Sequence, residues 1–337
     1  MQFFLNLLPF GLALAVSAGL TYWMVTADWK WAVDLPGERS LHTRPVPRTG
    51  GIGLFAGVLV SGAFVSLKGS QWPWLEPIIA CALCAISLVD DRRGLSVAVR
   101  LSAHLGAALL FLVCVLVDGR GQLANLPAWL WLPLAFLTIV AMSNFYNFMD
   151  GANGMAGGMT LIGFGAFTAA AITTQPGLAA LCAALAGAAL GFLLFNWPGR
   201  IFMGDCGSVP LGFLAASIGV SGWLAGAWAF WFPAIVFAPF IVDASVTLLR
   251  RFWRGDRIWQ AHREHYYQRA VRMGLSHGRV AMWEYVLMVA CAAAALALPG
   301  FDAAGQALIF ATIGLLFMLV MVVIDVRWRR HLAQHPY

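Results

Sequence analysis

Long apolar runs separated by short polar segments recur along the whole chain of 337 residues. Most runs approach or exceed the roughly 18 to 20 residues that an α-helix needs to cross a bilayer. The pattern therefore predicts an all-α fold: a polytopic transmembrane helical bundle of about 11 spans, in one membrane domain over residues 1–337. The expected spans cover residues 4–27, 50–67, 75–89, 101–117, 128–148, 155–174, 178–195, 207–224, 228–248, 280–298 and 305–326.

The composition and the first apolar run agree with an integral membrane protein. Hydrophobic residues make up 61% of the chain and charged residues only 11%, whereas a soluble domain usually has about a quarter of its residues charged. Residues 4–27 lack the basic n-region and the cleavage pattern of a signal peptide, so we expect a retained first span. The six cysteines are scattered and predict neither a disulfide framework nor a metal centre.

The distribution of Lys and Arg predicts how the bundle is oriented. If the chain starts outside, all of the 21 basic residues except Lys68 and Arg120 fall in connecting segments on the inner side. The positive-inside rule then places the N-terminus in the periplasm and the C-terminus in the cytoplasm. The net charge of +6 therefore reflects topology and does not indicate nucleic-acid binding. Because the outer loops are short, we expect the functional site on the cytoplasmic face.

The first inner segment, residues 34–51, is rich in polar and turn-forming residues. Its prolines and its Gly-Gly pair predict a stiff, tightly turned loop. Such a loop would hold Arg39, His42 and Arg48 near one another, where they could bind a substrate. A solvated basic loop at the membrane surface is the alternative.

Two adjacent carboxylates, Asp90 and Asp91, end the third expected span at the negative pole of its helix dipole. A cation would stabilise them there. Hard oxygen ligands suit Mg²⁺, which is often held by one or two carboxylates together with substrate phosphates. In the alternative interpretation they are ordinary capping acids, matched by Arg92 and Arg93.

Polar residues recur every three positions at the inner end of the fifth expected span. Asn144, Asn147 and Asp150 share one helix face by this spacing, and Gly151 then breaks the helix. Amides and carboxylates are costly at the end of a membrane helix and are usually functional there. Hydrogen bonding between helices is the alternative role.

Two further inner segments carry candidate residues. The first contains Asn196 and then Asp205, which lies between glycines where the chain re-enters the membrane. If the helices form a bundle, Asp205 joins Asp90 and Asp91 around one divalent ion.

The second segment, in the longest inner loop, contains His262, Arg263 and His265. Neither a Glu at zincin spacing nor a nearby Cys supports a zinc site. Arg and His together favour a phosphate or a sugar as the ligand. A basic amphipathic helix lying on anionic lipid is compatible with the same residues.

In order along residues 34–269, these five segments resemble the polyprenyl-phosphate N-acetylhexosamine-1-phosphate transferases. That family has an Asp-Asp pair after the third helix, an Asn-x-x-Asn-x-x-Asp-Gly segment, a Gly-Asp-x-Gly-Ser loop and a late histidine motif. Asn153 replaces a second acid that the family often has, and His-Arg-Glu-His replaces three consecutive histidines. The chain is therefore more similar to the GlcNAc-1-phosphate transferase branch, which primes O-antigen synthesis, than to the phospho-N-acetylmuramoyl-pentapeptide translocases.

The resemblance implies transfer of an N-acetylhexosamine 1-phosphate from a UDP-amino sugar to undecaprenyl phosphate. The products would be a polyprenyl-diphosphate-sugar and UMP, and the reaction would initiate O-antigen or other cell-envelope polysaccharide synthesis. It implies an enzyme of the bacterial inner membrane that acts at the cytoplasmic face, without nucleic acid as a partner. Membrane lipids surround such an enzyme, and homodimers are known among its relatives.

The resemblance also implies a role for each candidate residue. The cofactor would be Mg²⁺, with Mn²⁺ as a substitute. Direct displacement at phosphorus, general-base catalysis and a covalent step all remain open, and a secondary transporter is the alternative from another functional class. The catalytic candidates are Asp90, Asp91 and Asp205; the metal ligands are Asp90, Asp91, Asp205, Asn147 and Asp150; the substrate-binding residues are Arg39, His42, Arg48, Asn144, Asn147, Asp150, Asn153, Asn196, His262, Arg263 and His265.

Overall fold

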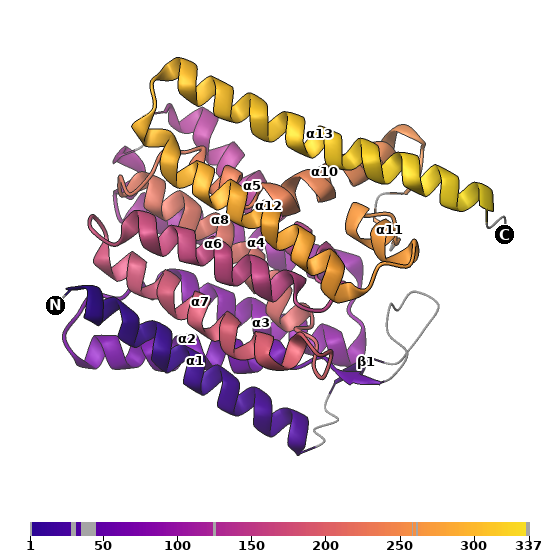
Figure 1. Ribbon diagram of the computed structural model, residues 1–337. Helices are drawn as coiled ribbons and strands as arrows, with labels where there is room; N and C mark the ends of the chain where they lie inside the picture. The colour runs from indigo at the N-terminus through magenta and orange to yellow at the C-terminus, as the bar shows by residue number, and fades with distance from the viewer. Residues whose placement is uncertain are drawn as a thin grey trace.

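The computed structural model is a bundle of roughly aligned helices (Figure 1). It describes residues 2–27, 32–34, 45–123, 126–257, 259–260 and 262–334. The predicted all-α architecture is confirmed, with one addition: a pair of two-residue antiparallel strands, β1 (Val33–Asp34) and β2 (Val46–Pro47). The α-helices are α1 (Gln2–Thr26), α2 (Gly50–Leu67), α3 (Leu75–Arg93), α4 (Val97–Val117), α5 (Ala128–Phe148), α6 (Met155–Ala171), α7 (Pro176–Asn196), α8 (Asp205–Leu224), α9 (Phe232–Val236), α10 (Ala238–Trp253), α11 (Tyr266–Arg272), α12 (His277–Ala297) and α13 (Ala303–Gln334).

The hydrophobic runs located these helices well. The bounds of α2 and α5 are those predicted, and most others differ by a few residues. The expected single span over residues 228–248 is wrong, because α9 ends at Val236 and α10 begins at Ala238. Pro239 explains the interruption, since proline has no backbone N–H to continue the hydrogen-bond ladder of α9.

The structure is that of a polytopic membrane protein. Eight of the described helices are long and apolar enough to cross a bilayer. The helix α6 is just below that length, with 17 residues, and α3 carries charged residues at its end. Together with the interrupted pair α9 and α10, these helices account for the difference from the predicted number of spans.

The bundle is built around α7 and α8, whose side chains are mostly buried, whereas α13 lies along one side with only 6% of its apolar window buried. Small residues allow α1 to approach α7 closely. A Cβ atom on Gly187 would lie 2.1 Å from the carbonyl oxygen of Phe10, and one on Gly191 would lie 2.6 Å from that of Leu14. Such small-residue contacts are typical of packed membrane helices.

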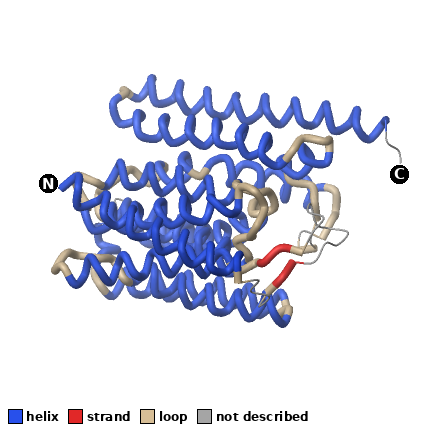
Figure 2. Tube along the Cα trace, turned by 60° about the horizontal axis from the view of Figure 1, so that its bottom comes forward, coloured by secondary structure: helices blue, strands red, loops and turns tan. Residues whose placement is uncertain are grey.

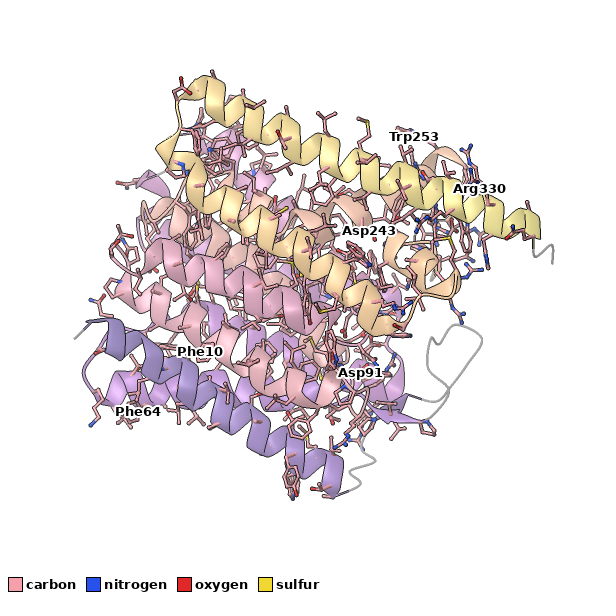
Figure 3. The ribbon with its side chains drawn as sticks, in the orientation of Figure 1. Phe10, Phe64, Asp91, Asp243, Trp253 and Arg330 are labelled. Carbon is pink, nitrogen blue, oxygen red and sulfur yellow. The ribbon has the colours of Figure 1, made fainter. Side chains whose placement is uncertain are left out.

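Segments that are far apart in sequence meet at one end of the bundle. The strand pair lies at this end (Figures 1 and 2), and so does α11 (Figure 1). Asp91 and Asp243 lie toward it as well, while Phe10 and Phe64 lie toward the other end (Figure 3). The fold therefore gathers the polar inner segments around one region.

Candidate active site

A short backbone pairing brings the start of α2 next to the start of α8. The backbone N–H of Phe202 donates to the carbonyl of Pro47 at 2.8 Å, and that of Gly50 donates to Phe202 at 3.0 Å. Two residues after Phe202, Gly204 has a φ of +73°, and a Cβ there would lie 2.3 Å from the carbonyl oxygen of Arg48. Glycine is therefore required at this position. The pairing holds the loop of Arg48 against the residue that precedes Asp205.

Asp91 faces the first turn of α8. Its carboxylate accepts a hydrogen bond from the backbone N–H of Cys206 at 3.4 Å and lies 3.9 Å from the guanidinium of Arg48. The side chain of Asp91 is only 3% exposed. Of the like charges that act on it, that of Asp205 has the largest effect. Two carboxylates from different helices thus share one small region with a single arginine.

Asp90 is held differently from its neighbour in sequence. One oxygen of its carboxylate accepts from the backbone N–H of Leu95 at 2.6 Å, and the other is 3.4 Å from the guanidinium of Arg100. Consecutive residues of a helix point about 100° apart, so the two acids cannot share all their partners. Asp90 is therefore matched by its own loop and by α4.

The predicted polar face of α5 completes the carboxylate group. The side chain of Asn147 interacts with the carboxylate of Asp205. Burial raises the pKa of the Asp150 carboxyl well above its usual value, and the charges of Asp205 and Asp91 raise it further, whereas Arg48 opposes them. We call Asp91, Asp150 and Asp205 the carboxylate cluster. Each member belongs to a different helix or to the loop after it.

A cavity of about 810 Å³ adjoins the cluster, a size within the usual range for small-molecule sites. One wall is apolar and includes Leu83, Leu101 and Leu248. Asn144 reaches the same cavity as Asn147 and lies 3.3 Å from a ring nitrogen of His104. The predicted site residues in the lining are Arg48, Asp90, Asn144, Asn147, Asp150, Asn153, Asn196, Asp205, His262 and His265.

Two predicted site residues are absent from the described lining, and two others lie outside the described residues. Asp91 stands behind that lining, in contact with Arg48. Arg39 and His42 lie outside the described residues. Arg263 is absent from the described lining, and its carbonyl accepts a hydrogen bond from Arg272 at 3.3 Å. The predicted contact of Arg263 with a ligand stays a prediction.

Asn196 joins two loops of the site. Its side-chain oxygen accepts from the backbone N–H of Gly154 at 2.7 Å, and its side-chain nitrogen donates to the carbonyl of Ile201 at 2.9 Å. Asn196 is 4% exposed, so its main structural role is to make these two hydrogen bonds to the backbone. It fixes the loop after Asp150 relative to the loop before Asp205. Its position in the sequence suggested a substrate contact and gave no sign of this role.

The two histidines of the late motif line the cavity with their rings tilted against each other and their centroids 4.9 Å apart. Burial, together with the charges of His265 and Arg251, lowers the pKa of His262 to about 4. His262 is thus a neutral imidazole at pH 7. The expectation that this histidine motif binds a phosphate or a sugar stays a prediction.

Asp243 of α10 lies 3.2 Å from Nδ1 of His265 and is not among the residues that the sequence motifs predict. Its position inside an expected span could have indicated a functional role, because an acid there is costly and usually functional. The motifs also do not predict the cavity-lining residues Arg100 and His104, since the charge of Arg100 only indicates topology.

The described residues contain no group of three or more His, Cys, Asp or Glu side chains arranged to hold a metal ion by themselves. Neither Asp90, Asp91 and Asp205 nor the carboxylate cluster forms such a group among these residues, so the predicted convergence of Asp90, Asp91 and Asp205 on one ion stays a prediction. The carboxylates of the cluster and the side-chain oxygen of Asn147 are all oxygen ligands, and the ionised carboxylates repel one another. This donor set fits a hard divalent cation that takes its remaining ligands from a phosphate-bearing substrate.

Comparison with known proteins gives a consistent result. The family described as Glycosyl transferase family 4 matches residues 75–222. A decaprenyl-phosphate N-acetylglucosaminephosphotransferase of Mycobacterium tuberculosis (strain CDC 1551 / Oshkosh) is 31% identical over 304 residues, which are 76% of this chain and 72% of that protein. A probable undecaprenyl-phosphate N-acetylglucosaminyl 1-phosphate transferase of Bacillus subtilis (strain 168) is 29% identical over 263 residues, 73% and 71% of the two chains.

A phospho-N-acetylmuramoyl-pentapeptide-transferase of Gloeothece citriformis (strain PCC 7424) is 33% identical over 220 residues, 60% of this chain and 59% of that protein. The residues matched by the family include the whole carboxylate cluster and end before the histidine motif. None of these relatives is a transporter, so they give no support to that alternative.

The neutral state of His262 can be tested directly. Because its pKa is lowered to about 4, we expect its ring to stay neutral as the pH falls from 7 toward 4. The folded chain then binds fewer protons at this residue than the unfolded chain between pH 6.5 and 4, so this residue's contribution to stability decreases as the pH falls through that window. Histidine ¹⁵N NMR of the protein in detergent would measure it, with His262→Gln assigning the signal. A titration midpoint near 6.5 would contradict the burial seen here.

Proposed function

The chain belongs to glycosyl transferase family 4, and from this membership we propose that it transfers an N-acetylhexosamine 1-phosphate from a UDP-amino sugar to a polyprenyl phosphate. The products are a polyprenyl-diphosphate-sugar and UMP. The observation that carries the proposal is the carboxylate cluster beside Arg48, at the edge of a cavity with one apolar wall. We take N-acetylglucosamine as the first sugar to test, since two of the relatives carry it in their names.

The reaction that we propose is a direct displacement at phosphorus. An oxygen of the lipid phosphate attacks the β-phosphorus of the UDP-sugar, and the bond from that phosphorus to the bridging oxygen breaks, so that UMP leaves. Arg48 would bind and orient the diphosphate, because a guanidinium matches phosphate oxygens well. Asn147 would hold the carboxylate of Asp205 in place through its amide. The apolar wall suits the lipid acceptor.

We propose Mg²⁺ as the cofactor, with Mn²⁺ as a substitute, held by Asp91, Asp150, Asp205 and Asn147. When bound, the ion supplies positive charge that offsets the charge of the diphosphate. Asp90 would contribute through Arg100, which it holds at the edge of the cavity. His262 and His265 would contact the donor from the opposite side.

We further propose that the chain is a single membrane domain of eleven spans, with the eight long helices joined by α3, α6 and the α9–α10 pair. The N-terminus would be periplasmic and the C-terminus cytoplasmic in a bacterial inner membrane. The excess of arginine in the segments around the cavity supports this orientation. Initiation of O-antigen or another envelope polysaccharide, and a homodimer, remain predictions from the family resemblance.

The products test the proposed function. Purified protein in detergent, given a polyprenyl phosphate, Mg²⁺ and UDP-N-acetylglucosamine or a related amino sugar, should form UMP and lipid diphosphate sugar in equal amounts. Asp205→Asn should lower turnover by at least about 100-fold, because a positioned charge at the reacting centre is lost. The matched control Asp302→Asn, in an exposed loop, should keep full activity. Release of UDP in place of UMP would show transfer of the sugar alone and contradict the proposal.

Topology reporters test the orientation. Fusions after Arg100, Arg200 and Arg257 should behave as cytoplasmic, and a fusion after Arg120 should behave as external. The physical reason is the excess of basic residues on one side of the chain. A periplasmic signal at Arg257 would contradict both the orientation and a cytoplasmic site.

A further inference from the structure

Asp243 is a buried carboxylate that lies inside α10 and points to the start of α11 (Figure 3). One of its oxygens accepts from the backbone N–H of Tyr266 at 3.0 Å and from the hydroxyl of Thr247 at 3.1 Å. The other accepts from the backbone N–H of Tyr267 at 3.1 Å. Asp243 is 6% exposed, so nearly all of its contacts are with the protein.

The same carboxylate fixes the proton of His265. Nδ1 of His265 lies 3.2 Å from Oδ1 of Asp243, and a carboxylate surrounded by donors acts as an acceptor. This contact favours a proton on Nδ1, which would leave Nε2 as the nitrogen available to a ligand. The ring stacks on Phe148 at 5.8 Å and is 2% exposed, so its orientation is also held by packing.

His262 has the opposite tautomer. Its Nδ1 lies 3.3 Å from the backbone N–H of Glu264 and accepts a hydrogen bond from it. In a neutral ring the proton is then on Nε2. The two neighbouring histidines thus have different hydrogen-bonding roles: Nε2 of His262 donates a hydrogen bond, and Nε2 of His265 accepts one.

Asp243 also connects α11 to the loop of Asp150. Tyr267, whose backbone N–H it binds, donates from its hydroxyl to the carbonyl of Phe148 at 2.8 Å. A Cβ on Gly151 would lie only 2.2 Å from that hydroxyl oxygen, so the turn after Asp150 fits tightly against Tyr267. A substitution of Asp243 would therefore affect the positions of both α11 and the loop that follows Asp150.

We propose that Asp243 is a positioning residue of the transferase, which acts through His265 by keeping the proton on Nδ1 and presenting Nε2 as an acceptor to the donor substrate. The inference rests on the proposed function for the identity of the substrate. The contact between Asp243 and His265 is present in the protein without any substrate. A carboxylate that orients a histidine in this way commonly affects activity without touching the substrate.

The tautomer can be measured without any substrate. In ¹⁵N-histidine NMR of the wild-type protein in detergent, we expect His265 to show a protonated Nδ1 and an unprotonated Nε2 at pH 7 to 8. Asp243→Asn should shift the ring toward the Nε2–H form. The matched control is Asp325→Asn, which removes the contacts of α13 to Arg250, Arg269 and Tyr266 but does not contact His265. It should leave the tautomer unchanged. An Nε2–H tautomer in the wild type would overturn the proposal.

Kinetics test whether Asp243 acts through His265. Asp243→Asn should lower kcat by about 10- to 100-fold, the range found for residues that orient a functional histidine. In a chain that already carries His265→Ala, the same change should have little further effect, since residues that act as a unit are not additive. Multiplying effects of the two changes would mean that Asp243 serves only the stability of α11, and the proposal would fail.

Failure of this proposal and failure of the proposed function can be told apart. If the wild type forms no UMP with any UDP-amino sugar, the proposed function is contradicted. The NMR result then decides the contact between Asp243 and His265 by itself. If Asp243→Asn does not fold, the wild-type tautomer still supports or overturns the inference, because that measurement needs no variant.

Discussion

The carboxylates of Asp91, Asp150 and Asp205 lie at one end of a helical bundle, close enough for their charges to repel one another. Like charges at close range in a partly buried setting destabilise each other and favour a bound cation or proton. Arg48, the backbone N–H of Cys206 in the first turn of α8 and the side chain of Asn147 offset part of this repulsion.

The surrounding structure can be understood as the frame that holds this cluster. Pairing between the loops that precede α2 and α8 sets the position of Arg48, and Gly204 permits the close approach of the two loops. Asn196 joins the loop after Asp150 to the same region. On the opposite side, Asp243 fixes α11 and with it the histidines. Most of these contacts involve backbone atoms, so the arrangement around the cluster is set by the fold and does not require a bound ligand.

The sequence predicted the helices and much of the site, but not how the site is held. Apolar runs determine where helices lie in a membrane, and a three-residue spacing brought Asn144, Asn147 and Asp150 to one cavity. The different partners of Asp90 and Asp91 depend on helix rotation and on α4, which no local pattern encodes. The interruption at Pro239 divided an expected span. Asp243 was hidden in an apolar run, because its partners come from residues about twenty positions later in the chain.

The central claim is that the carboxylate cluster holds a divalent cation, and ion binding tests it most directly. Electron paramagnetic resonance of Mn²⁺ titrated into the purified protein with UDP-N-acetylglucosamine should show one bound ion, displaced by Mg²⁺. Affinity should fall at least about tenfold in Asp91→Asn, because a carboxylate ligand is lost. It should be unchanged in Asp302→Asn. Binding of Mn²⁺ that is equally tight in wild type and in Asp91→Asn would contradict the account.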